Sequence, residues 1–159
     1  MSEHKTVLEH PTIGRVRGVS RVPDVVQYLG LKYATLSDRF ARSELLESYS
    51  PNEDGVLDAT KIGPIPLSPV DGCQWEHKLI QHSLPSPEFE QSDTECLTLN
   101  IAVPDLATDG RGGQPWPVLA LVHGGAFATG SSSYPQYDLA RIVQMSVEVG
   151  QPIIAVGIK

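Results

Sequence analysis

The stretch covering residues 118–158 constrains the fold of this chain more than any other part of its sequence. It begins with five consecutive apolar residues, 118–122, which is typical of a strand covered on both faces. A glycine loop follows, then an amphipathic helical pattern over residues 138–149 and a second apolar run over residues 152–158. This order predicts a right-handed βαβ crossover in a parallel sheet.

The helix in this unit has recognisable ends. Asp138 is a suitable N-cap, because its carboxylate can accept a hydrogen bond from a free amide of the first turn. Gly150 and Pro152 follow the last apolar position of the helix and are expected to end it.

The N-terminal half predicts antiparallel pairing. Residues 14–19 alternate apolar with basic side chains, and residues 25–33 form a second strand pattern after a turn at residues 21–24. Residues 97–103 alternate again. We therefore expect an α/β fold in which an antiparallel hairpin leads into a mostly parallel sheet.

Three segments are expected to be irregular. Residues 34–91 contain six widely spread prolines, each of which removes a backbone donor, and are expected to form a long loop. Residues 105–117 are expected to be a surface loop. Residues 1–12 are expected to be a flexible terminus.

Composition excludes several classes of partner. The chain has 159 residues, enough for about one domain, and 12 basic against 19 acidic side chains give a net charge of -7. This balance disfavours binding to nucleic acid. No apolar run approaches the roughly 20 residues of a membrane span, and no secretory signal pattern is seen, so we expect a cytoplasmic protein without a membrane span.

The glycine loop is the strongest candidate for chemistry. Its residues, His123-Gly124-Gly125-Ala126-Phe127, follow a predicted strand at the edge where open α/β sheets bind ligands. Consecutive glycines let backbone N–H groups converge on one point, as an oxyanion hole requires. The alternative is that the two glycines only make a sharp turn out of the strand.

The chain as a whole resembles the type-B carboxylesterases, a cholinesterase-like family of the α/β-hydrolase fold that includes fungal lipases. The resemblance spans residues 13–158. The two most specific parts are the block Glu95-Cys96-Leu97-Thr98-Leu99-Asn100 and the glycine loop at the family's distance from it. Further matches are residues 14–18, 28–34, 39–40, 117–122 and 152–158.

The resemblance implies an ester hydrolase with an oxyanion hole at Gly124, Gly125 and Ala126, in which the N–H groups of Gly125 and Ala126 are two of the donors. The family's nucleophile sits in a Gly-x-Ser-x-Gly elbow and is followed by an acid and a histidine. No such elbow occurs here, and the serines at 131–133 are expected to form a turn.

Residues 1–159 are therefore expected to be the truncated N-terminal fragment of a single domain. We expect no catalytic serine, acid or histidine in the chain and no activity from it alone. The substrates implied are small-molecule carboxylic esters, with no cofactor and no metal, and the oligomeric state is open. A second candidate is a non-catalytic remnant or binding module, because the family also contains catalytically inactive adhesion proteins. A third is a product that does not fold stably alone.

Two smaller groups of residues also carry expectations. Cys73 and Cys96 enclose 22 residues, and a disulfide between them would contribute roughly 3 kcal/mol, although a reducing compartment would leave both as thiols. The resemblance pairs Arg39 with an acid, here Asp93 or Glu95. His77 and His82 near Glu76 do not have the His-Glu-x-x-His spacing of a zinc site.

Overall fold

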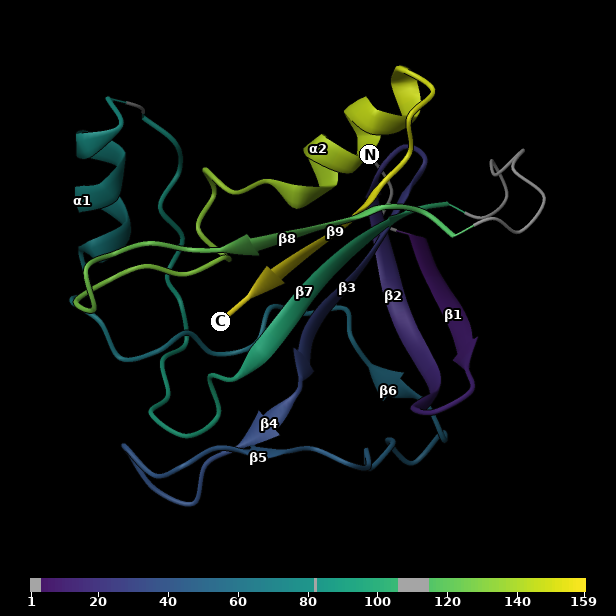
Figure 1. Ribbon diagram of the computed structural model, residues 1–159, viewed down its shortest axis with the longest axis horizontal. Coiled ribbons are helices and arrows are strands. Elements are labelled where there is room, and N and C mark those ends of the chain that lie inside the picture. The colour runs from purple at the N-terminus through teal and green to yellow at the C-terminus, as the bar shows by residue number, and fades with distance from the viewer. Residues whose placement is uncertain (1–3, 82, 106–114) are drawn as a thin grey trace.

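A mixed β-sheet forms the centre of the computed structural model, which describes residues 4–81, 83–105 and 115–159. The strand order is β1-β2-β3-β7-β9-β8, and β6 pairs with β2 beside this path (Figure 1). The strands on the path are β1 (His4–His10), β2 (Gly14–Val22), β3 (Val25–Lys32), β7 (Thr98–Pro104), β9 (Ile154–Ile158) and β8 (Val118–Val122).

The expected hairpin is confirmed, and β1 extends it. Strand β2 pairs antiparallel with β3 across a turn in which Asp24 has a φ of 60°. The expectation of a flexible terminus is wrong for His4–His10, because β1 pairs with β2 over seven positions, from His4 opposite Ser20 to His10 opposite Gly14. Leu8 packs against the buried cluster that contains Val16, and this contact holds an otherwise polar strand in place.

The predicted strand–loop–helix–strand unit is also confirmed. Strands β8 and β9 are parallel and pair from Val118 opposite Ile154 to Val122 opposite Ile158. Strand β9 is antiparallel to β7, and every pair from β1 to β7 is antiparallel too. The sheet is therefore more antiparallel than expected, because the parallel pairing of its described strands is limited to β8–β9, the short β2–β6 contact and an isolated bridge between Leu29 and Thr60.

The prediction that β8 is covered on both faces is wrong for the described part of the chain. Val118 is 63% exposed and Val122 is 75% exposed. Strand β8 ends the sheet and pairs only with β9 among the described residues. A continuous apolar run indicates a strand that is suited to burial, but whether it is covered depends on what packs against it.

Helix α2 (Leu139–Glu148) lies over β7, β9 and β3 (Figure 1). Asp138 caps it as predicted, because its side chain accepts a hydrogen bond from the Arg141 amide at 3.1 Å. Gly150 ends it with a φ of 72°, and its N–H reaches the Val147 carbonyl at 2.9 Å, which is a Schellman-type end. Leu139, Ala140 and Val143 bury the apolar face against the sheet.

The long segment before β7 is only partly irregular. It contains the helix α1 (Gly72–Leu79), which the sequence analysis missed, and three two-residue strands. These are β4 (Ala34–Thr35) paired with β5 (Glu44–Leu45), and β6 (Leu57–Asp58). Neither helix in the described part of the chain has the length and apolar character needed to cross a bilayer.

Candidate functional site

The glycine loop leaves the sheet at the carboxyl end of β8. Because β8 and β9 are parallel, the end of β9 at Ile158 lies at this same edge. His123 follows β8 directly and donates from its Nδ1 atom to the Gly124 carbonyl at 2.7 Å. The predicted site residues Gly124, Gly125 and Ala126 therefore lie where the topology of α/β sheets favours ligand binding.

The backbone of this loop is left-handed over three consecutive residues. The φ angles are 123° at Gly125, 53° at Ala126 and 61° at Phe127. Gly125 cannot be replaced by a residue with a side chain for two reasons: its φ is positive, and a Cβ atom would lie 1.9 Å from the Thr129 carbonyl oxygen. Ala126 carries its Cβ in a region that alanine enters only at a cost of roughly 1–2 kcal/mol.

Hydrogen bonds hold the carbonyl side of the loop and leave the amide side open. The Gly125 carbonyl accepts from the N–H groups of Ala128 at 3.0 Å and Thr129 at 3.1 Å. The N–H groups of Gly125 and Ala126 have no hydrogen-bond partner among the residues that the structure describes. Two adjacent unpaired donors at a sheet edge are suited to an oxygen that gains negative charge.

Helix α1 packs beside this loop through a polar network. The Gln136 side chain donates from Nε2 to Glu76 Oε2 at 2.9 Å, and its Oε1 lies 2.9 Å from His77 Nε2. Burial raises the pKa of Glu76, and the nearby His123 and the hydrogen bond from Gln136 counteract this effect. His77 is only 4% exposed. The sequence analysis missed Gln136, because no pattern marks a single glutamine in a turn.

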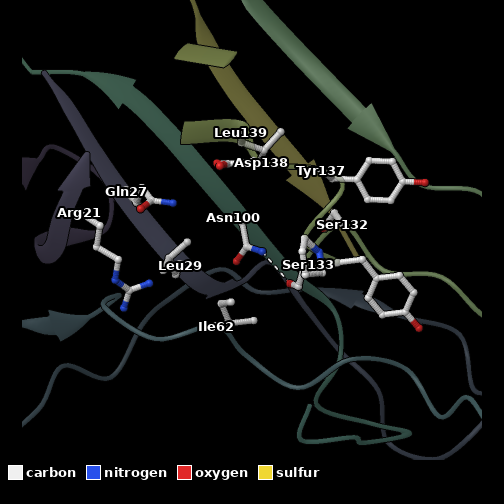
Figure 2. A pocket seen from close by; sticks show the side chains of 12 residues that line it. Arg21, Gln27, Leu29, Ile62, Asn100, Ser132, Ser133, Tyr137, Asp138 and Leu139 are labelled. Atoms are coloured by element: carbon white, nitrogen blue, oxygen red, sulfur yellow. Dashed lines mark hydrogen bonds between the residues drawn. The ribbon is translucent and has the colours of Figure 1, made fainter. Parts of the chain in front are cut away.

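The serine segment behind the loop forms a turn, as expected. Ser131 and Ser132 are buried, and Ser133 Oγ accepts from Asn100 Nδ2 at 2.8 Å. Figure 2 shows this bond at the wall of a cavity of about 240 Å³, which Arg21 also lines. Among the described residues, no histidine hydrogen-bonds to Ser131, Ser132 or Ser133. The arrangement therefore lacks the hydroxyl–imidazole pair that activates a serine nucleophile.

The two cysteines do not form a disulfide in this structure. Both Cys73 and Cys96 are buried free thiols, and burial raises the pKa of each. The Cys73 thiol lies 3.7 Å from Ser86 Oγ and 3.8 Å from His77 Nε2. A buried thiol with a raised pKa is a poor nucleophile, so this group serves packing.

The expected ion pair of Arg39 is not formed. Glu95 binds Lys32 Nζ at 2.6 Å instead, and the Arg39 guanidinium lies 5.0 Å from the centre of the Phe40 ring. Lys159, at the edge that carries the loop, donates from Nζ to the Gly63 carbonyl at 2.7 Å. Burial lowers the pKa of Lys159 to about 8.

In the ranges 4–81, 83–105 and 115–159, no three His, Cys, Asp or Glu side chains lie close enough together to hold a metal ion. His82 lies outside the described residues. His77 faces Gln136 and Ser86, and both are ordinary hydrogen-bond partners.

Comparisons with known proteins agree on one family. The family model that matches describes the Carboxylesterase family and covers residues 4–157. Over 145 residues the chain is 31% identical to a probable N-octanoylanthranilate hydrolase of Rhodococcus erythropolis, covering 91% of this chain and 27% of that protein. It is 32% identical over 129 residues to the para-nitrobenzyl esterase of Bacillus subtilis, covering 81% and 23%.

Solved structures give the same result for the fold. A PNB esterase superposes with a TM-score of 0.70 at 27% sequence identity, covering 96% of this chain and 27% of that chain. A thermophilic PNB esterase gives a TM-score of 0.69. The α/β-hydrolase type of fold is therefore confirmed for this N-terminal part, and the chain spans about a quarter of the length of these relatives.

Proposed function

Because this chain belongs to the carboxylesterase family, we propose that it supplies the oxyanion-binding loop of a serine ester hydrolase. The observation that carries this proposal is the pair of adjacent, unpaired N–H groups of Gly125 and Ala126 at the carboxyl edge of the parallel strands. Attack on an ester carbonyl turns the carbonyl oxygen into an oxyanion, which such donors stabilise.

The role of this chain is then electrostatic. A serine hydroxyl attacks the carbonyl carbon and loses its proton to a histidine, and the carbonyl oxygen takes the negative charge. The amides of Gly125 and Ala126 donate to that oxygen, and their orientation is set before the substrate arrives. The nucleophile, the acid and the histidine would lie outside residues 1–159, as the one-quarter coverage of the relatives suggests.

The substrate class we propose is small-molecule carboxylic esters. Two relatives are named as a para-nitrobenzyl esterase and a probable N-octanoylanthranilate hydrolase. Both names denote hydrolysis at an acyl carbon. Hydrolysis by a serine triad needs neither a cofactor nor a metal.

A fluorophosphonate probe, which labels activated serines, tests this function. We would capture the protein from its source with an antibody raised against the 159-residue chain, label it and map the labelled peptide. The expected result is a labelled protein heavier than 17.2 kDa, with the labelled serine outside residues 1–159. The purified 159-residue chain is expected to show no burst with an activated ester.

Two results would contradict the proposal. Saturable, fluorophosphonate-sensitive turnover by the 159-residue chain would place a nucleophile within it. Failure of every captured form to react with the probe would instead favour the non-catalytic binding module.

A further inference from the structure

The contacts of Gln136 go beyond what a turn residue needs. Its side-chain nitrogen donates to the Glu76 carboxylate, so its side-chain oxygen must face His77. Because that oxygen only accepts, His77 Nε2 is the donor of this contact. His77 Nδ1 lies 3.4 Å from Ser86 Oγ, whose hydroxyl donates to the Cys73 thiol. One amide therefore fixes the orientation of two side chains of α1.

A turn earlier, the same helix contacts Thr129, two residues after the glycine loop. A Cβ atom on Gly72 would lie 2.4 Å from Thr129 Oγ1, so the backbone of α1 lies directly against Thr129. Thr129 Oγ1 also lies 3.2 Å from the hydroxyl of Tyr134, which is 1% exposed. Helix α1 is thus held against residues 129–136 at two points, Gly72 and the pair Glu76–His77.

Thr129 connects these contacts to the open amides. The N–H group of Thr129 donates to the Gly125 carbonyl. The next residue, Gly130, lies against the Gly124 carbonyl, because a Cβ atom added to Gly130 would be 2.1 Å from the Gly124 oxygen. A displacement of residues 129–130 must therefore move Gly124 and Gly125. The left-handed backbone at Ala126 is a strained conformation that persists only when its surroundings hold it.

We propose that Gln136 is a positioning residue, which locks α1 onto residues 129–136 and so keeps the N–H groups of Gly125 and Ala126 aligned. The catalytic consequence of this alignment rests on the proposed function, in which the two N–H groups bind the oxyanion. The restraint itself is a property of the 159-residue chain and can be measured without catalysis.

The first test measures backbone order in the 159-residue chain by NMR relaxation. Gln136→Ala removes both hydrogen bonds, and we expect the order parameters of residues 125–127 to fall from about 0.85 to below about 0.6, with those of α2 unchanged. Gln144→Ala is the matched control, because Gln144 bonds only to Arg141 on the surface of α2 and should change nothing in the loop.

Exchanging the carboxylate of Glu76 with the amide of Gln136 distinguishes loss of their hydrogen bond from a general loss of packing. Gln136→Glu places two carboxylates against each other and should loosen the loop, whereas Glu76→Gln keeps an acceptor for Gln136 and should have little effect. The double variant Glu76→Gln/Gln136→Glu restores a donor facing an acceptor and should recover the order parameters. Unchanged order in Gln136→Ala, or no recovery in the double variant, would overturn the proposal.

Kinetics on the longer protein that the fluorophosphonate probe identifies, prepared without the label, give the second readout. There Gln136→Ala should lower kcat about 10-fold or more, less than the 10²–10³-fold loss caused by removing an oxyanion donor, and leave KM within about twofold. A change confined to KM would overturn the positioning role. If the loop loosens but no form of the protein hydrolyses esters, the proposed function fails and the structural role of Gln136 stands.

Discussion

At the scale of single residues, Ala126 combines a required N–H with an unfavourable backbone. Its φ of 53° suits glycine better than alanine. Alanine therefore occupies this position at a cost in backbone strain. The cost is local, because the Ala126 side chain is exposed.

Ala126→Gly should therefore stabilise the chain. Removing the Cβ relieves roughly 1–2 kcal/mol of backbone strain, and the greater freedom of glycine in the unfolded chain offsets about 0.4–1 kcal/mol of that. We expect a net gain of about 0.5–1 kcal/mol in the free energy of unfolding, measured by urea denaturation.

Ala128→Gly is the control for this prediction. Ala128 is exposed in the same loop but is not among the residues with a positive φ, so only the entropic cost applies and stability should fall. Equal effects of the two variants would show that Ala126 is not strained.

Lys159 makes stability depend on pH. Its pKa is lowered to about 8 in the folded chain, mainly by burial, against an ordinary value of 10.5. Between these two values the unfolded chain holds a proton that the folded chain has released. Stability must therefore rise with pH across this window and is reduced below it.

Lys159→Met isolates this effect. In a Cys96→Ala background, which removes the thiol whose pKa Lys159 itself affects, the free energy of unfolding without the Lys159→Met change minus that with it should increase by about 3 kcal/mol between pH 8 and 10.5. Urea denaturation at several pH values measures the difference. A difference that stays constant with pH would mean that Lys159 is not desolvated.

At the scale of elements, α2 is held by its ends as well as by its apolar face. Asp138→Ala removes the acceptor for the Arg141 amide and should lower the free energy of unfolding by about 1 kcal/mol. Asp138→Asn keeps a capping oxygen and should cost only a few tenths. Thermal denaturation of both variants tests the cap, and equal losses would contradict it.

Elements with strong local signals could be predicted from the sequence. The β2–β3 hairpin, β7, α2 and β9 all combine periodic apolar residues with a turn or cap residue. Helix α1 has only eight residues and lies in a proline-rich segment, and β1 exposes most of its side chains. Helix α1 is held by contacts with residues 129–136, which are distant in the sequence, and β1 is held by pairing with the neighbouring β2. Neither kind of contact leaves a periodic apolar pattern within the element itself.

The candidate site divides in the same way. The position of the glycine loop at the end of β8 followed from the order of the strands. The N–H groups of Gly125 and Ala126 were expected as donors only through the family resemblance. The Gln136 network was not predicted, because it depends on α1 meeting residues 129–136 from about 60 positions away. Sequence spacing carries no information about that contact without the fold.

At the scale of the whole molecule, the exposed edge of β8 is the feature that we expect to promote association. An apolar strand with one unpaired side is a template for pairing with another chain. We predict that Val122→Lys, at a position that is 75% exposed, will shift the 159-residue chain toward monomer in size-exclusion chromatography with light scattering. The charge opposes pairing of the edge and removes little buried surface.

Val149→Lys provides the control, because Val149 is 71% exposed at the end of α2 and not on the sheet. It adds the same charge but should leave the association unchanged. Equal shifts toward monomer in both variants would mean that the change in net charge, and not the edge of β8, reduces association.

The position of β9 between β7 and β8 also sets an order of folding. Strands β1, β2 and β3 follow one another in both sequence and space, and β7, which pairs with β3, precedes β8 in the chain. A nascent chain can therefore form this antiparallel part before its C-terminal third is synthesised. Strand β8 is made next but has no partner in the sheet until Ile154–Ile158 emerges. Five residues made late therefore join β8 to the rest of the sheet, and until then β8 and the glycine loop it carries remain exposed to the folding machinery of the cell.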